Sequence, residues 1–230
     1  MNFESISEAQ ALGLDPSHLV EISPGCLIHG AIEAPLSTLY DKCRADGCVL
    51  SVASGYRSFD RQLAIFNAKA RGERAVLDDA GRPVEMSGLS EREQLFAILR
   101  FSALPGASRH HWGTDIDVYD AAAIEPDYRV RLTYDECAQG GVFGRLHQHL
   151  DSALTAGGGF YRPYDCDRGG VAPEPWHLSY GPLARRFEQV LTRDLLGDQL
   201  AVTDIELKSA ILNHLDAIYA RFVCLQKRDV

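Results

Sequence analysis

Hydrophobic residues along the chain follow two different periods, and together these predict a mixture of helices and strands. Apolar side chains that recur every three or four residues are typical of a helix with one packed face. The helices expected on this basis cover residues 31–45, 59–71, 90–101, 145–155, 182–195 and 203–225. Short runs of β-forming residues predict strands at 48–53, 114–119, 160–164 and 176–180. Before all of these, residues 1–30 predict a short acidic helix followed by a turn at Pro24 and Gly25.

Two serines mark helix starts. Ser58 is placed to cap a helix that ends at Gly72, and Ser90 with Glu93 forms a capping box. The first of these caps places Arg57 between a strand and a helix, at a junction where functional side chains often lie.

The strand expected at 114–119 has two chemically different faces. Ile116 and Val118 point to one side, whereas Asp115, Asp117 and Tyr119 point to the other. This alternation predicts a strand with an apolar face in the core and a carboxylate face turned toward a site.

The order of these elements favours an α+β fold. We expect a small central antiparallel sheet flanked by helices, with a C-terminal helical extension. We also expect a single domain over residues 1–230, with its core at about 31–182 and the C-terminal helices at about 183–230. Residues 121–144 form an insertion of low regularity, for which a lid and a rim both remain open.

Composition narrows the classes of function. The 230 residues are 46% hydrophobic with a net charge of −9, and no Lys/Arg cluster suits nucleic acid. No apolar run approaches the roughly 20 residues of a membrane span. The first residues lack a basic segment followed by an apolar one, so a cytoplasmic location is expected, with the periplasm or cell wall as the alternative. Six cysteines without CxxC pairs indicate free or buried thiols, although disulfides stay open for an exported protein.

Residues 108–117 carry the densest chemistry of the chain. They hold two imidazoles and two carboxylates around Gly113, a set that suits zinc. A catalytic zinc ion takes three protein ligands and keeps one position open, and we expect the third ligand in residues 174–177. From these residues alone, His110 and the neighbouring His111 both remain open as ligands.

These residues resemble the signatures of a known family. Residues 108–117 are similar to the SxHxxGxAxD motif of the LAS metallopeptidases, and residues 174–177 match their ExxH motif. Residues 54–62 match a third element, SGYRSxxxQ. The family includes the VanY-type D-alanyl-D-alanine carboxypeptidases, and the resemblance covers roughly residues 45–182.

The resemblance implies a role for each matching residue. One Zn²⁺ ion would be held by His110, Asp117 and His177. Glu174 would act as the general base, and Arg57 would face the scissile carbonyl. Three further residues are expected near the substrate. Ser108 and Gln62 would form hydrogen bonds with it, and Trp176 would form a packing wall beside the site.

The implied reaction is zinc-dependent hydrolysis of the terminal D-alanine amide bond in a peptidoglycan stem peptide or muropeptide, by a D,D- or L,D-carboxypeptidase. An endopeptidase that cuts between L-alanine and D-glutamate is the first alternative. A non-catalytic zinc module like the Hedgehog signalling domain is the second, and the presence of Glu174 and Arg57 argues against it. The oligomeric state is open.

One residue departs from the family pattern. Asp115 stands where the motif usually has alanine. Its carboxylate suits two roles, as an acceptor for a histidine N–H or as a partner of Arg109. Both remain open from the sequence.

Overall fold

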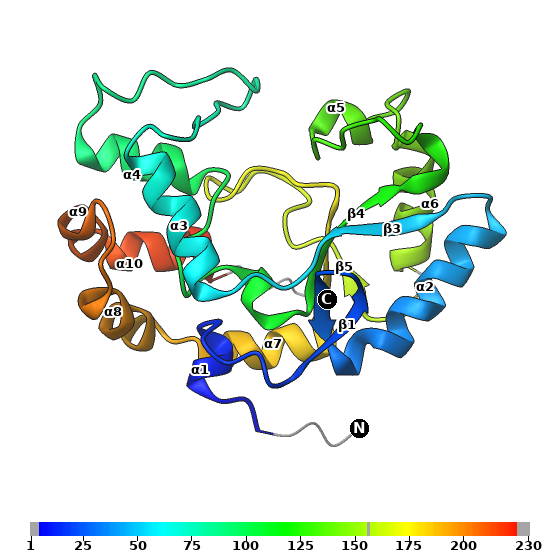
Figure 1. The fold of residues 1–230 in the computed structure, drawn as a ribbon, viewed down its shortest axis with the longest axis horizontal. Helices are drawn as coiled ribbons and strands as arrows, with labels where there is room; N and C mark the ends of the chain where they lie inside the picture. Colours follow the sequence, from blue (N-terminus) through cyan, green and yellow to red (C-terminus); the bar gives the residue numbers. More distant parts are fainter. Residues whose placement is uncertain (1–4, 156, 225–230) are drawn as a thin grey trace.

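The computed structural model describes residues 5–155 and 157–224. Its centre is a four-stranded sheet in the order β3-β4-β6-β5, with every neighbouring pair antiparallel. The strands are β3 (Leu50–Ser54), β4 (Asp115–Asp120), β5 (Phe160–Tyr161) and β6 (His177–Tyr180). The expected α+β fold with a small antiparallel sheet is therefore confirmed (Figure 1).

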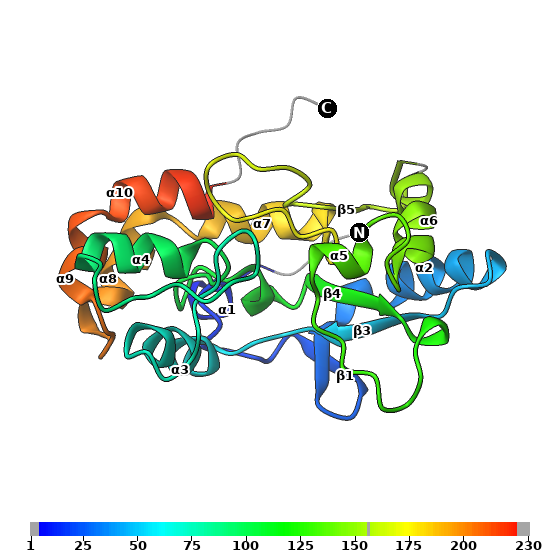
Figure 2. The ribbon, with the colours of Figure 1, turned by 90° about the horizontal axis from the view of Figure 1, so that it is seen from above.

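Helices surround this sheet in two groups (Figure 1). Beside one end of the sheet lie α2 (Glu33–Ala45) and α6 (Gly144–Thr155), which pack against each other. The other group contains α3 (Phe59–Ala70), α4 (Glu91–Leu99), α8 (Arg193–Val202), α9 (Lys208–Asn213) and α10 (Leu215–Ile218). Seen from above, α7 (Gly181–Val190) and α10 lie on the opposite side of β3 and β4 from α3 (Figure 2).

The predicted caps form as expected. Ser58 accepts a hydrogen bond from the backbone N–H of Arg61 at 3.1 Å, and so fixes the start of α3. Ser90 and Glu93 form the reciprocal capping box of α4. Each cap satisfies backbone donors that have no partner inside the first helical turn.

The predicted two-faced strand is β4. Ile116 and Val118 are fully buried in the hydrophobic core, which confirms the apolar face. On the other face, the strand register sets Asp117 opposite His177 of β6 and opposite Ser54 of β3. Pairing in the sheet therefore brings together residues that are 60 or more positions apart in sequence.

The helix expected at 182–195 is wrong as a single element. It divides into α7 and α8, because Thr192 has an extended backbone and caps α8 through the N–H of Leu195. The sequence pattern did not predict this break, because apolar residues continue at helical spacing through it. Both helices bury their apolar face against the same core.

The helix expected at 203–225 is also divided. Residues 203–207 are not helical, and Leu207 has a φ of +57° immediately before α9. After α10 the chain continues in a π-helical turn, Tyr219–Val223, and residue 225 lies outside the described residues. Most of the apolar residues expected on the packed face of this segment are buried, namely Ile205, Ile211, Leu215, Ile218 and Phe222. Tyr219 is partly buried, whereas Leu212, expected on the same face, is exposed.

The N-terminal part contains a hairpin that the sequence analysis missed. Strands β1 (Leu19–Ser23) and β2 (Cys26–His29) pair on either side of the predicted turn at Pro24 and Gly25. The acidic helix is reduced to α1 (Glu8–Ala11), and residues 1–4 lie outside the described residues.

Residues 11–13, at the end of α1, are hydrogen-bonded to the motif segments. The indole N–H of Trp112 donates to the carbonyl of Ala11 at 3.0 Å. The carbonyl of Gly13 accepts from the hydroxyl of Tyr56 at 3.0 Å and from the backbone N–H of Phe59 at 2.9 Å.

The remaining elements are short. The strand expected at 160–164 covers only Phe160–Tyr161, since Pro163 has no N–H to donate to a neighbouring strand. The insertion at 121–144 contains one 3₁₀ turn, Ala121–Ala123, and one helical turn, α5 (Tyr134–Cys137). All six cysteines are free thiols. Among the described residues, no helix combines the length and the hydropathy that crossing a bilayer requires.

Candidate metal centre

Three side chains predicted as ligands converge in the structure. His110 comes from the 3₁₀ turn Arg109–Trp112, Asp117 from β4 and His177 from the first position of β6. One ligand atom from each lies within 4.8 Å of the others, and all three residues are buried. Asp117 is central, with Oδ2 at 3.3 Å from His110 Nε2 and Oδ1 at 3.3 Å from His177 Nδ1.

Hydrogen bonds behind the ligands fix which ring nitrogens face the centre. His110 Nδ1 lies 2.9 Å from the carbonyl oxygen of Gly55, so Nδ1 carries the hydrogen and Nε2 presents a lone pair. His177 is held in the opposite sense, because its Nε2 lies 3.0 Å from Asp115 Oδ1 and its Nδ1 faces Asp117. This is how proteins orient histidines that bind a metal.

The electrostatics of the centre favour a bound cation. Asp117 Oδ1 is buried and has no hydrogen-bond partner among the described residues. Burial alone would lower the pKa of His177, but the hydrogen bond to Asp115 and the nearby carboxylates of Asp117 and Glu174 raise it well above its usual value. Two imidazole nitrogens and a carboxylate fit zinc, so the residues present match the expected metal.

Asp115 carries out both of the roles left open by the sequence. Besides accepting from His177, its Oδ1 accepts from Arg109 Nε at 2.7 Å. Its Oδ2 accepts from the hydroxyls of Thr114 at 2.8 Å and Ser179 at 3.0 Å. Burial alone would raise the pKa of Asp115, but the charge of Arg109 and the hydrogen bond from His177 lower it to about 2. The carboxylate is therefore ionised, fully buried and saturated with donors.

Glu174 lies beside the ligands on the loop before β6. Its Oε2 is 3.4 Å from His177 Nδ1, the nitrogen that faces the centre. Its side chain keeps 15% of its surface exposed, so solvent reaches it. This position fits the predicted general base, and the role itself stays a prediction.

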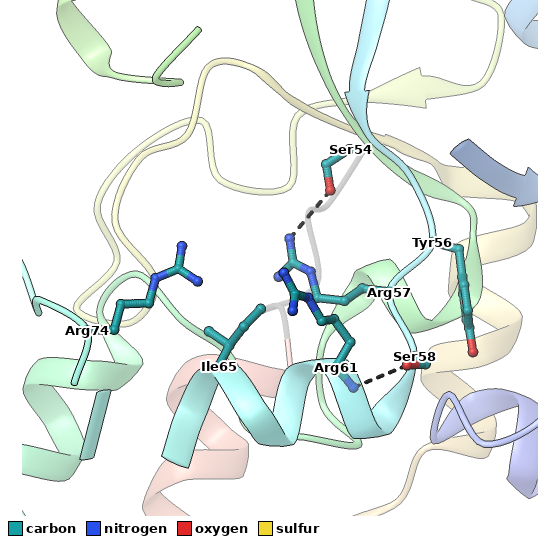
Figure 3. Close-up of a pocket in the computed structure, with 7 residues that line it drawn as sticks. All are labelled: Ser54, Tyr56, Arg57, Ser58, Arg61, Ile65 and Arg74. Atoms are coloured by element: carbon teal, nitrogen blue, oxygen red, sulfur yellow. Dashed lines mark hydrogen bonds between the residues drawn. The ribbon is translucent and has the colours of Figure 1, made fainter. Parts of the chain in front are cut away.

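Arg57 reaches the same region from the end of β3. Its guanidinium donates to Ser54 Oγ at 3.4 Å (Figure 3). It also donates to Gln62 Oε1 at 2.9 Å, and the backbone N–H of Arg57 donates to the carbonyl of His110. Burial lowers the pKa of Arg57, while the charges of Asp117 and Glu174 act in the opposite direction. The cation is therefore close enough to the acidic groups of the centre to interact with them.

The three residues predicted near the substrate have different positions. Gln62 is fully buried, and its Nε2 donates to the carbonyl of Ala103 at 2.7 Å, so its amide supports Arg57 from behind. Ser108 is 3% exposed, directly before the 3₁₀ turn that carries His110. Trp176 is 9% exposed and fits the expected wall. Direct contact of these residues with a substrate stays a prediction.

His111 is turned away from the centre. Its Nε2 accepts from the backbone N–H of Gly106 at 3.0 Å, and its Nδ1 donates to the carbonyl of Arg57 at 2.6 Å. Burial lowers its pKa to about 3, so this ring is neutral and serves the scaffold.

A pocket of about 480 Å³ opens beside Arg57. Its lining includes Ser54, Ser58 and Ile65 together with two further cations, Arg61 and Arg74 (Figure 3). The sequence analysis missed both arginines. Arg61 follows Arg57 by four residues and was a detectable signal, whereas Arg74 lies in a stretch that reads as surface loop.

Comparison with known proteins gives consistent matches. The sequence profile described as VanY, D-alanyl-D-alanine carboxypeptidase, matches residues 26–183. A D-alanyl-D-alanine carboxypeptidase of Enterococcus faecalis is 27% identical over 162 residues, which are 70% of this chain and 51% of that protein. An uncharacterized protein of Haemophilus influenzae is 30% identical over 127 residues, which are 52% of this chain and 92% of that protein.

Solved structures share the fold. A mutant of the vancomycin resistance D,D-pentapeptidase VanY in complex with Zn(II) has a TM-score of 0.52 at 22% identity, covering 86% of this chain and 92% of that chain. The LdcB LD-carboxypeptidase has a TM-score of 0.51 at 23% identity, covering 86% of this chain and 78% of that chain.

Proposed function

Because the chain belongs to the VanY D-alanyl-D-alanine carboxypeptidase family, and is therefore a peptidase, we propose that it removes the terminal D-alanine from peptidoglycan stem peptides or muropeptides in a zinc-dependent reaction. The observation that carries this proposal is the convergence of His110, Asp117 and His177 with Glu174 Oε2 at 3.4 Å from a ligand nitrogen. A site that only bound zinc would not need a carboxylate at that position.

The chain's own residues divide the chemistry between them. His110, Asp117 and His177 would hold the zinc ion, which when bound would supply a water of pKa about 7. The Glu174 carboxylate lies where it can accept a proton from the attacking water and return it to the amine that leaves. The Arg57 guanidinium, fixed by Gln62 and Ser54, donates to the carbonyl oxygen as negative charge develops there. One such donor contributes about 3–4 kcal/mol to the transition state.

Substitution of Glu174 tests the assignment of the base. Glu174→Ala should bind zinc stoichiometrically and lose at least about a hundredfold in turnover, since general base catalysis contributes about 10²–10⁴-fold. Glu33→Ala, which removes an exposed carboxylate on α2, serves as the matched control. Zinc content and release of D-alanine are measured on the same samples. Undiminished release in Glu174→Ala would remove the base from the mechanism.

The bond that is cut can be determined with three substrates. Muropeptides with a stem ending in D-Ala-D-Ala, muropeptides with a tetrapeptide stem, and intact cross-linked peptidoglycan are incubated with the protein, and products are identified by mass spectrometry. Loss of one alanine from the first or second substrate indicates D,D- or L,D-carboxypeptidase activity respectively. A cut between L-alanine and D-glutamate would instead establish the endopeptidase alternative. Zinc binding without any product would favour the non-catalytic module.

A further inference from the structure

We propose that Arg61 and Arg74 form a binding site for a carboxylate group of the peptide substrate beside Arg57. This inference rests on the proposed function, because it concerns how the same site selects its peptide. Arg57 is expected to face the scissile carbonyl. The ligand proposed for Arg61 and Arg74 is a different group, a carboxylate elsewhere on the same peptide.

The geometry places three guanidinium groups around one pocket. Arg61 lies in the first turn of α3, and Arg74 comes from the loop that follows this helix. Figure 3 shows Arg57 and Arg61 on one side of the pocket and Arg74 on the other, with Ile65 of α3 between them. The volume of about 480 Å³ is large enough for one or two residues of a bound peptide.

Within the part of the chain that the structure describes, Arg61 and Arg74 form no ion pair, and the acidic groups of the metal centre act on Arg57 only at longer range. In the ranges 5–155 and 157–224, no Asp or Glu oxygen lies within 4.0 Å of a side-chain nitrogen of Arg57, Arg61 or Arg74. Many other arginines of the protein do have such a partner, for example Arg71, Arg82, Arg100, Arg109, Arg162 and Arg193. In this chain with a net charge of −9, the described residues therefore leave two exposed guanidinium groups beside one pocket without an ion pair.

Two neighbouring features increase the attraction for an anion. The pocket borders the N-terminus of α3, a 12-residue helix whose dipole favours negative charge at that end. Lys69 is partly buried on the same helix, and burial together with Arg74 and Arg57 lowers its pKa to about 8. The charge of Glu174 acts on the pKa of Lys69 in the opposite direction.

The chemistry of the pocket indicates a carboxylate. Guanidinium groups bind carboxylates through two parallel hydrogen bonds, a geometry that Arg61 and Arg74 can each provide from an exposed position. A stem peptide carries two kinds of carboxylate, one at its C-terminus and one on acidic residues such as D-glutamate. Both kinds match the site, and the experiment separates them.

The test compares three peptides on three proteins. The peptides are a stem pentapeptide, its C-terminal amide, and an analogue with the acidic side chains amidated. The proteins are the wild type, the Arg61→Gln/Arg74→Gln double variant, and Arg44→Gln, which removes an exposed charge on α2, away from α3 in Figure 1. For each zinc-loaded protein, kcat/KM is measured with each peptide. The Kd of each peptide is measured on the same proteins carrying the additional substitution Glu174→Ala, so that the peptide is bound without being cleaved.

The double variant should lose about 10- to 100-fold in kcat/KM on the free-acid peptide, as expected for one or two hydrogen bonds to a charged group. In the wild type, one of the two amidations should produce a loss of the same size, and this identifies the recognised carboxylate. Combining that amidation with the double variant should add no further loss. Arg61→Lys/Arg74→Lys, which keeps the charge but not the paired geometry, should recover part of the affinity.

Two results would overturn the inference. In one, neither amidation weakens binding to the wild type; in the other, Arg44→Gln lowers kcat/KM as much as the double variant does. A failure of the proposed function is recognised separately, since no peptide would then be cleaved while the Kd values still report on the carboxylate site.

Discussion

Replacing Asp115 with alanine, the residue usual at this position in the family motif, should destabilise this protein severely. The side chain of Arg109 is 3% exposed and that of Asp115 is fully buried, so the pair is shielded from solvent. Removing one partner of such a pair costs about 3–5 kcal/mol, and the cation that Asp115→Ala leaves behind keeps the partly exposed Glu188 as an ion-pair partner. The hydroxyls of Thr114 and Ser179 lose their acceptor as well.

This cost is large compared with the total stability of a domain, which is about 5–15 kcal/mol. For a chain of this length, each kcal/mol lowers Tm by about 2–4 °C, so Asp115→Ala should lower it by about 6–20 °C. Thermal and urea unfolding of the metal-free protein measure this directly. Zinc affinity should also fall about 10- to 100-fold, because the N–H of His177 loses the acceptor that orients its ring.

A double variant provides the control for Asp115→Ala. Arg109→Met removes the charge that Asp115→Ala would leave behind, and it leaves the partly exposed Glu188 to solvent. Apolar replacement of a buried pair is often nearly neutral. The double variant should therefore be more stable than Asp115→Ala alone, although its zinc affinity should stay low. The reasoning fails if the free energy of unfolding of Asp115→Ala lies within about 1 kcal/mol of the wild-type value. It also fails if the destabilisation of the double variant equals the sum of the two single destabilisations.

Three further predictions concern the scaffold of the site. Gly113→Ala should cost several kcal/mol in urea unfolding, because Gly113 has a φ of +66° and an added Cβ would lie 2.7 Å from the backbone nitrogen of His29. His111 has a pKa of about 3 when folded and about 6.5 when unfolded, so the unfolded chain binds one more proton between these values. The free energy of unfolding should therefore be highest above pH 6.5 and should fall by about 1.4 kcal/mol per pH unit as the pH decreases toward 3. In His111→Gln, a pH series of urea midpoints should show a smaller slope. Gln62→Met should lower kcat while zinc affinity, measured by competition with a chelator, stays at the wild-type value, because it removes the acceptor that holds Arg57.

Local signals in the sequence predicted much of the fold. The starts of α3 and α4 were correct because a serine cap acts within three residues of its own position. Strand β4 was correct because its alternation matches the two faces of the sheet. The breaks at Thr192 and Leu207 were missed because the apolar pattern continues through them, and packing against the core decides where such a helix ends.

The metal centre was predictable because its residues lie in two short motifs. The residues that support the metal centre by hydrogen bonds were less predictable. Asp115 and Ser179 are 64 positions apart, and only the pairing of β4 with β6 brings their side chains together. The pocket at Arg74 depends on a loop whose path the sequence does not determine.

The bonds made by residues 11–13 have a practical consequence for anyone who shortens this protein. The family match begins at residue 26, which invites a truncation there. Such a truncation would deprive the Trp112 indole of the Ala11 carbonyl, and would deprive Tyr56 and Phe59 of the Gly13 carbonyl. Trp112 lies two residues from His110, and Tyr56 is adjacent to Arg57. Residues 11–13 are therefore part of the framework that holds the motif segments, even though no chemistry is assigned to them.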